Sequence, residues 1–497
     1  MRRLCLRLVW AALFYAWPSG TPAKDSAAPL VVEDVFGRRL NRHGLLLVDW
    51  DGYMANPAIK FFLIPPRDAA LPARAVLTAE EPRLYFNLPS TTGPRGPRKE
   101  LVFKTAAKVA VYISIFPDRD GRDEGHILRI EFKDAKGDSN TVRLPVHVID
   151  LDRERPVVFP ITVDYSQDKT GFFRDPEKRK VVEQAASDWA GFIDDMGVRP
   201  VAVGAEKTHI WPPEGFKDGR QVTNAKGYSG YLLYAYGIRT GEVRSGGEPS
   251  ADGGFQSSRG HALPIRRSGG LEVEVRGNYN RKGWLVRLDD RDWWKATNLG
   301  DVPNDLYSIV HHEIGHALFF NPANTLFARA KSKGRLRSAA LRAYLGTDPK
   351  INPADHFDGM VDPASRRGVF GYEYHGDMPL GRWLITKTDL LCAQALGYKL
   401  RRTSALVPLN LLTRSLSAGK VGERYSEDLR AKGGIPLYNW QVTAGSLPAG
   451  LLLNAFTGEI GGIPTKEGSF DFTVRVRDYD ERRRGLRRQF KIEVVAH

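Results

Sequence analysis

Apolar and polar positions alternate in the first third of the chain. The alternation is clear in 128–132 and 142–148, where every second residue is apolar, as in a strand that buries one face. Turn-rich stretches at 117–125 and 136–138 separate such segments. The pattern predicts one antiparallel β-sandwich, or two small ones, over residues 24–152.

The period changes to that of a helix after residue 156. A strand is expected over 157–165, and Asp175 followed by Pro176 has the form of a helix start. Apolar residues then recur at helical spacing over 181–196, and Gly197 is expected to end the helix. A strand followed by a long helix indicates an α+β region.

The middle of the chain contains a second predicted helix. Residues 237–270 are rich in Gly, Ser and Arg and favour a surface loop, whereas 271–275 alternate like a strand. The helix is expected to begin near Pro303 and to run to Phe320, where Pro322 prevents its continuation.

The last 95 or so residues again have the period of strands, clearest in 470–477 and 490–494. Their turn residues are LPAGL at 447–451, TGEI at 457–460 and GIP at 462–464. In order and spacing these turns resemble those of the immunoglobulin-like, cadherin-related modules of bacterial secreted proteins. The resemblance implies a C-terminal immunoglobulin-like β-sandwich over 403–497.

The N-terminus has the layout of a secretory signal peptide. Arg2, Arg3 and Arg7 precede and enter an apolar run at 8–17, and Ala23 offers a small residue for cleavage. We therefore expect residues 1–23 to be a signal peptide and the protein to be secreted, either extracellular or periplasmic. An uncleaved anchor is the alternative. No other stretch is suited to crossing a bilayer, so no integral span is expected after removal of the signal.

Charge and cysteine content narrow the classes of protein further. The formal net charge is +15, which becomes +12 when the three arginines of the signal are removed. No nucleic-acid motif accompanies the basic residues, so no specific nucleic-acid partner is expected. Removal of Cys5 leaves Cys392 alone, which excludes an internal disulfide and indicates a buried, inert thiol.

The candidate chemistry lies in the second predicted helix. His312 and His316 are four residues apart, so they share one face of a helix and can bind a single zinc ion. Glu313 is the candidate general base, placed to take a proton from a water that the metal activates. Buried apolar neighbours such as Val310 and Ile314 favour a narrow polar face for the metal.

A catalytic zinc needs a third protein ligand and one open position. A compact motif would place that ligand at position 322, but this residue is Pro322. We choose His356, in a loop 40 residues beyond His316 where the chain can fold back. Glu373 and His375 are the alternatives. Glu373 and Asp377 have a spacing that resembles the gluzincin family, which implies a ligand on a helix, but glycine and proline around Glu373 disfavour a helix there.

Residues 165–398 resemble the leishmanolysin-type metzincins and their bacterial relatives. The resemblance implies a zincin-like α+β metallopeptidase domain over 153–402, with a distant histidine as third ligand and a methionine turn beneath the metal. The residues that it carries over are His312, Glu313, His316, His356, Met378 and the closing helix at 384–398. Two departures stand out: Phe319 replaces the family's usual glycine, and Met360 competes with Met378 as the turn methionine.

These features predict a secreted zinc metalloendopeptidase that acts on protein or peptide substrates. The β-regions are expected to position it on a substrate, a cell surface or a matrix polymer. The alternative is a catalytically inactive zincin-fold adhesion protein, but such proteins commonly lose the base, and Glu313 is present.

Three further sites stay open on the sequence alone. Calcium is a second candidate cofactor, because Asp118, Asp120, Asp123 and Glu124 cluster near Gly121. A solvated hairpin turn is the simpler interpretation of that run. His311 and His375 flank the predicted site, as substrate contacts or, more simply, as histidines in water.

Overall fold

The structure is a computed structural model of the 497-residue chain. It describes residues 29–496, apart from the segments listed at the end of this paragraph. The expected signal peptide at 1–23 lies outside the described residues. No helix in the described part of the chain is long and apolar enough to cross a membrane. The undescribed segments are 42, 53, 88–97, 119, 153–155, 211–219, 239–248, 252–254, 257–261, 264–267, 275–283, 286–303, 321–324, 353–356, 358–359, 370–383 and 481–484.

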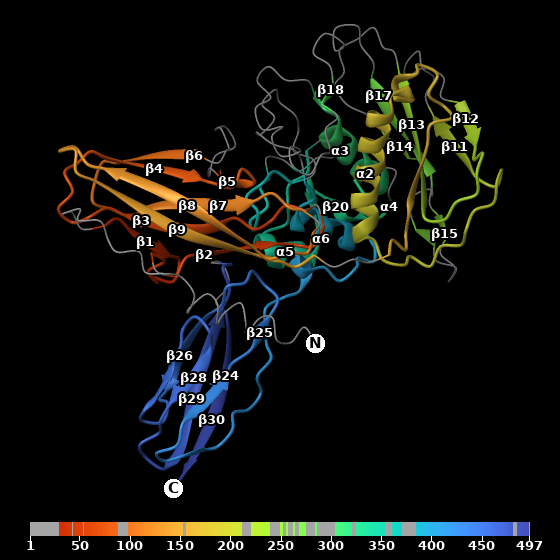
Figure 1. Ribbon diagram of the computed structural model, residues 1–497. Coiled ribbons are helices and arrows are strands. Elements are labelled where there is room, and N and C mark those ends of the chain that lie inside the picture. The colour runs from red at the N-terminus through yellow and green to blue at the C-terminus, as the bar shows by residue number, and fades with distance from the viewer. Residues whose placement is uncertain are drawn as a thin grey trace.

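The N-terminal region is a two-sheet β-sandwich, as the alternation predicts (Figure 1). Apolar side chains of both sheets alternate inward, for example in β3, where every second residue is buried. Neighbouring strands are antiparallel except for the parallel pair β2 and β9. The first sheet has the order β1(Val31–Asp34), β3(Ile59–Ile64), β7(Val109–Ile115), β5(Leu84–Asn87). The second has the order β2(Leu45–Asp49), β9(Ser139–Asp150), β8(Glu124–Lys133), β4(Ala73–Ala79), β6(Arg98–Phe103).

The central region combines a mixed sheet with helices. Its sheet has the order β10(Ile161–Asp164), β13(Tyr231–Ile238), β17(Ser268–Glu274), β14(Pro249–Ala251). The first three strands are parallel and β14 is antiparallel to β17, at the edge of the sheet. Two helices, α2(Pro176–Phe192) and α3(Leu306–Leu318), pack against each other beside this sheet (Figure 1).

Short elements complete the central region. They are η1(Phe172–Arg174), β11(Lys207–Ile210), β12(Arg220–Thr223), β15(Phe255–Gln256), β16(Ala262–Leu263), β18(Trp284–Leu285), β19(Asn304–Asp305), α4(Thr325–Ala330), β20(Lys331–Ser332), β21(Arg335–Leu336), α5(Ala339–Leu345), α6(Lys387–Ala395) and η4(Ser404–Leu406).

Two sequence-based expectations for this region need correction. Helix α2 starts as predicted, with the Asp175 carboxylate accepting the Glu177 N–H, but it ends at Phe192 because Ile193 is already extended. Residues 237–270 were expected to be a loop, yet they contain β14, β15, β16 and the start of β17. Strand pairing with β17 and between β15 and β16 outweighs the glycine-rich composition there.

The C-terminal unit is a β-sandwich with a hydrophobic core of its own. Trp440, Ile460, Val474 and Ile492 belong to that core. The turn at Gly450 requires glycine, because φ is +92° and a Cβ there would lie 2.0 Å from the Ile463 carbonyl oxygen. The strands are β22(Asn410–Leu411), β23(Gly419–Lys420), β24(Tyr425–Asp428), β25(Ala431–Lys432), β26(Asn439–Gly445), β27(Leu451–Leu453), β28(Glu459–Gly462), β29(Gly468–Arg477) and β30(Leu486–Val495).

The N-terminal sandwich and the central helices share one continuous hydrophobic core. Backbone bonds cross between them, because the Ala55 N–H donates to the Ile385 carbonyl and the Ala58 N–H to the Ala364 carbonyl, both at 2.8 Å. The buried guanidinium of Arg367 donates to the Tyr85 hydroxyl at 2.9 Å. The sandwich therefore forms part of the central fold.

The C-terminal unit touches the N-terminal sandwich through a small contact around Arg38. The guanidinium of Arg38 donates to the carbonyls of Tyr438 and Ala455, each at 3.4 Å. The rings of Phe36 and Tyr479 lie 5.5 Å apart, centroid to centroid. Ile435 and Tyr479 of this unit are buried in the shared core, whereas its other buried apolar residues form the separate core. The unit therefore depends less on the rest of the chain than the sandwich does.

The N-terminal sandwich shares a core with the central helices, whereas the C-terminal unit makes a smaller contact around Arg38. This contrast predicts different outcomes for the removal of each. A chain that begins at Pro156 should be insoluble or lack a cooperative thermal transition, because Leu384, Ile385 and Arg367 lose the partners that bury them. A chain that ends at Thr403 should stay folded and soluble, with a thermal midpoint lowered by a few degrees at most.

Soluble yield, circular dichroism and thermal unfolding of both truncated chains check this prediction. A cooperative transition in the chain without the sandwich would show that the shared core is dispensable. Aggregation of the chain that ends at Thr403 would place the C-terminal boundary elsewhere.

Candidate metal centre

Helix α3 is held by a stripe of apolar residues spaced four apart along one face. Leu306, Val310, Ile314 and Leu318 are at most 1% exposed. Trp189 of α2 adds a polar tie, because its indole N–H donates to the His311 carbonyl at 2.9 Å. The fixed helix leaves little freedom to the side chains of the motif.

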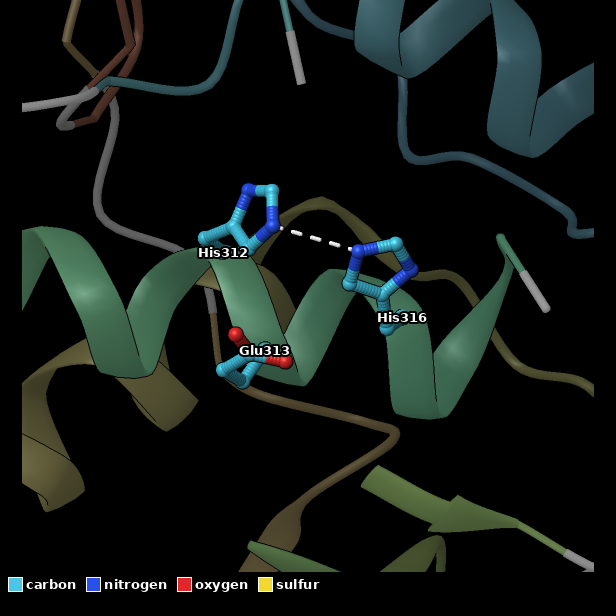
Figure 2. Close-up of side chains that lie close together, drawn as sticks. All are labelled: His312, Glu313 and His316. Carbon is cyan, nitrogen blue, oxygen red and sulfur yellow. Dashed lines mark hydrogen bonds between the residues drawn. The ribbon is translucent and has the colours of Figure 1, made fainter. Parts of the chain in front are cut away.

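His312 and His316 converge on one side of α3 (Figure 2). Their Nε2 atoms lie 3.1 Å apart, and their rings are nearly perpendicular at 82°. Two imidazoles on a tetrahedral zinc at 2.0–2.1 Å would hold their nitrogens about 3.3 Å apart. The pair has the spacing that one ion requires.

The tautomer of His316 is set by the end of its own helix. Its Nδ1 lies 2.6 Å from the Phe320 carbonyl oxygen, which can only accept, so the ring proton is on Nδ1. The Nε2 lone pair then faces His312. A hydrogen bond from a protonated Nε2 of His312 is the metal-free alternative for this contact, whereas a zinc ion would take both lone pairs.

Glu313 lies with the two histidines, as the sequence predicts. One carboxylate oxygen and one nitrogen of each histidine are all within 4.8 Å of one another. The residue is 9% exposed, so its carboxylate stands at a largely closed site. The three residues fit a zinc ion with an adjacent base.

The candidates for the third ligand lie outside the described residues. This holds for His356, Glu373 and His375, and also for Met378. Phe357, the residue after His356, is described, and its ring lies 5.6 Å from that of Phe320. Phe320 is also the residue whose carbonyl oxygen lies 2.6 Å from His316 Nδ1, so Phe357 contacts a direct neighbour of the metal pair.

Phe319, which departs from the glycine expected from the sequence resemblance, has a packing role in the structure. Its ring is fully buried between Trp189, at 5.1 Å, and Tyr398, at 4.3 Å. The Tyr398 hydroxyl donates to the Leu318 carbonyl at 2.6 Å. An aromatic contact and a hydrogen bond therefore close the end of α3 against the chain after α6.

The simpler interpretation of His311, a histidine in water, is wrong. The ring is 3% exposed and stacks between Trp189 and Tyr307, at 5.3 and 5.2 Å. Burial lowers the pKa of this imidazole to about 3, so it is neutral at physiological pH. Helical periodicity could have predicted that His311 is buried, since it shares a face of the helix with Tyr307 and Ile314.

The acidic run at 118–124 joins two different sheets, because β7 and β8 belong to opposite sheets of the sandwich. It is therefore not the expected hairpin turn. Arg83 donates to Asp118 and Glu124, so a guanidinium already lies between these carboxylates. Calcium binding there stays a prediction.

A second group of carboxylates adjoins this run. Asp49, Asp118 and Asp150 each place an oxygen within 4.8 Å of the others. Burial and neighbouring carboxylates raise the pKa of Asp150 to about 6 and that of Asp152 to about 7. For Asp152 burial is the largest cause, and the charges of Asp150 and Asp51 add to it.

Comparison with known families identifies the C-terminal unit. Residues 408–492 match the family described as "Putative Ig domain". This match confirms the immunoglobulin-like prediction for that unit and does not extend to the metal site. None of the curated proteins matches the chain.

Solved structures that resemble the chain do so weakly. Mouse cadherin-23 EC22–24 aligns over 94% of this chain and 100% of its own length, at 8% identity and a TM-score of 0.18. A Bacteroides fragilis structure described as "a putative alpha-galactosidase" has 21% identity, 18% coverage of this chain and a TM-score of 0.15. The alignments span 17% and 19% of the two galactosidase chains of this kind. Scores this low carry no argument about the fold.

The cluster of carboxylates around Asp152 predicts an unusual pH dependence of the folding stability. The folded state keeps the proton of Asp152 up to about pH 7, whereas an unfolded aspartate loses it near pH 3.9. Stability should therefore fall as pH rises between these values, and Asp152→Asn should stabilise the protein at pH 8 while flattening the curve.

Urea midpoints of the parent and the variant between pH 4 and 8 measure this effect. Asp348→Asn is a control of opposite sign, because the hydrogen bond from Arg342 lowers the pKa of Asp348. That variant should lose stability at pH 8 and approach the parent as pH falls. Equal midpoints for Asp152→Asn and the parent at pH 8 would contradict the assignment.

Proposed function

We propose that this protein is a secreted zinc metalloendopeptidase with its catalytic site on α3. The observation that carries the proposal is the pair of Nε2 atoms 3.1 Å apart, with the proton of His316 held on Nδ1 by the Phe320 carbonyl. Structural zinc sites are usually closed by cysteines, whereas two imidazoles beside a glutamate are typical of catalytic sites.

We further propose His356 as the third ligand. The contact of Phe357 with Phe320 supports this choice, since His356 directly precedes Phe357 in the sequence. Three neutral imidazoles would leave the ion its full double charge, which a carboxylate ligand would partly cancel.

A zinc ion bound at this site would act as a Lewis acid on the substrate carbonyl and lower the pKa of the attacking water. Glu313 would take the proton of that water and pass it to the leaving amine. His312 and His316 would hold the ion, and Glu313 lies beside them on the same helix, α3.

Strand β14 supports a peptide as the substrate. It is the edge strand of the central sheet and lies next to α3. An extended peptide can add to such an edge through backbone hydrogen bonds, independently of its side chains.

Export and surface attachment belong to the same proposal. The expected signal peptide supports secretion, and an immunoglobulin-like unit suits attachment to a protein or a surface polymer. An inactive adhesion protein is the competing function. The presence of Glu313 within reach of both histidines favours the enzyme.

Replacing the base should separate metal binding from turnover. Glu313→Gln should keep its zinc but lose hydrolysis by roughly 10²- to 10⁴-fold, because an amide cannot take the proton. Zinc content by elemental analysis and cleavage of a quenched peptide library measure the two properties.

The control is Glu177→Gln, an exposed substitution on α2, which should leave both properties unchanged. Turnover of Glu313→Gln equal to that of the parent would remove Glu313 as the base. A parent protein without zinc after loading, or with zinc content unchanged by His312→Ala/His316→Ala, would refute the metal site itself.

The third ligand is tested by competition with a chelator. His356→Ala should weaken zinc binding by a factor on the order of ten to a hundred or more, as expected for a lost ligand. Glu373→Ala should have a much smaller effect. Loss of zinc from the Glu373 variant, with retention by the His356 variant, would instead identify Glu373 as the ligand.

A further inference from the structure

A pocket beside the metal pair has no role in the proposed reaction. It lies between α3 and the start of α6, and Trp189, His311, His312 and Asp389 are among the residues that line it. Val369 and Ile385 give it apolar walls. One metal ligand, one further histidine and one carboxylic acid therefore meet at the same small enclosure.

His311 places a buried polar ring at this pocket, and burial of its nitrogens costs free energy. Its two faces are covered by the rings of Trp189 and Tyr307, so hydrogen bonds can form only at the ring edge. Both ring nitrogens are buried and have no hydrogen-bond partner within the described part of the chain. Because an unpaired buried nitrogen is costly, the pocket is expected to supply a partner.

Asp389 brings a carboxylate that is only 1% exposed. Its Oδ2 accepts the backbone N–H and the hydroxyl of Thr386, both at 2.7 Å, and so caps α6. A carboxylate can accept about four hydrogen bonds. Asp389 can thus serve the cap and a water molecule in the pocket at the same time.

We propose that Asp389 and His311 are positioning residues for His312, joined to it through water held in this pocket. The inference rests on the proposed zinc site. Zinc at Nε2 of His312 requires the ring proton on Nδ1, and an acceptor for that proton fixes the tautomer and the ring orientation. A water shared with Asp389 and the neutral His311 has the two to four polar partners that a buried water needs.

Zinc affinity and stability of the full chain test the proposal. The variants are Asp389→Asn, His311→Phe and their combination, and His311→Phe retains the aromatic stack. Each single variant should weaken zinc binding roughly 10- to 100-fold in competition with a chelator. The double variant should bind zinc no more weakly than the single variant with the lower zinc affinity, because each single substitution already removes the same water network.

Asp362→Asn is the matched control. Asp362 is a fully buried carboxylate that accepts bonds from Thr388 at the same end of α6, and it is not among the residues lining the pocket. This variant should lower the thermal midpoint while leaving the zinc dissociation constant unchanged. The visible spectrum of the cobalt-loaded protein should shift in Asp389→Asn and His311→Phe and stay constant in Asp362→Asn.

Three outcomes would overturn the inference. Equal losses of zinc affinity in Asp389→Asn and Asp362→Asn would mean that helix stability alone is involved. A His311→Phe protein that is more stable than the parent and binds zinc equally well would show a dry pocket. A parent chain that binds no zinc would overturn the proposed function as well, whereas the first two outcomes leave it intact.

Discussion

The packing of Trp189 against α3 is the contact on which the candidate site depends. The indole N–H of Trp189 donates a hydrogen bond to the His311 carbonyl, and the indole ring stacks on the His311 ring and contacts Phe319. A single side chain of α2 thereby fixes the motif helix at its middle and at its end. A buried donor with one correct acceptor also sets the register of the two helices, since a slip by one residue would leave the indole unpaired.

Much of this arrangement follows from periodicity. The alternation in 128–132 and 142–148 predicted the sandwich, and the helical spacing around His312 predicted α3, because both patterns record which face is buried. Capping chemistry located the start of α2 at Pro176. The proximity of Glu313 to both histidines follows from the helical spacing alone.

Contacts between segments far apart in sequence could not be predicted in this way. The pairing of Ala55 with Ile385, and that of Arg367 with Tyr85, join residues more than 280 positions apart. Nothing in the local pattern of either segment records its partner. The same applies to Asp389, which the sequence shows only as a good helix start, and to the strands within 237–270, which form because β17 offers a partner.

The continuous core beneath the N-terminal sandwich and the helices has a thermodynamic consequence. Elements that bury one another gain or lose their contacts together, so these two regions should constitute a single cooperative unit of more than 300 residues. The immunoglobulin-like unit, with its separate core, is a second one. A chain that looks like three domains in Figure 1 should therefore unfold as two units, and unfolding of α3 should be coupled to unfolding of strands in the first hundred and fifty residues.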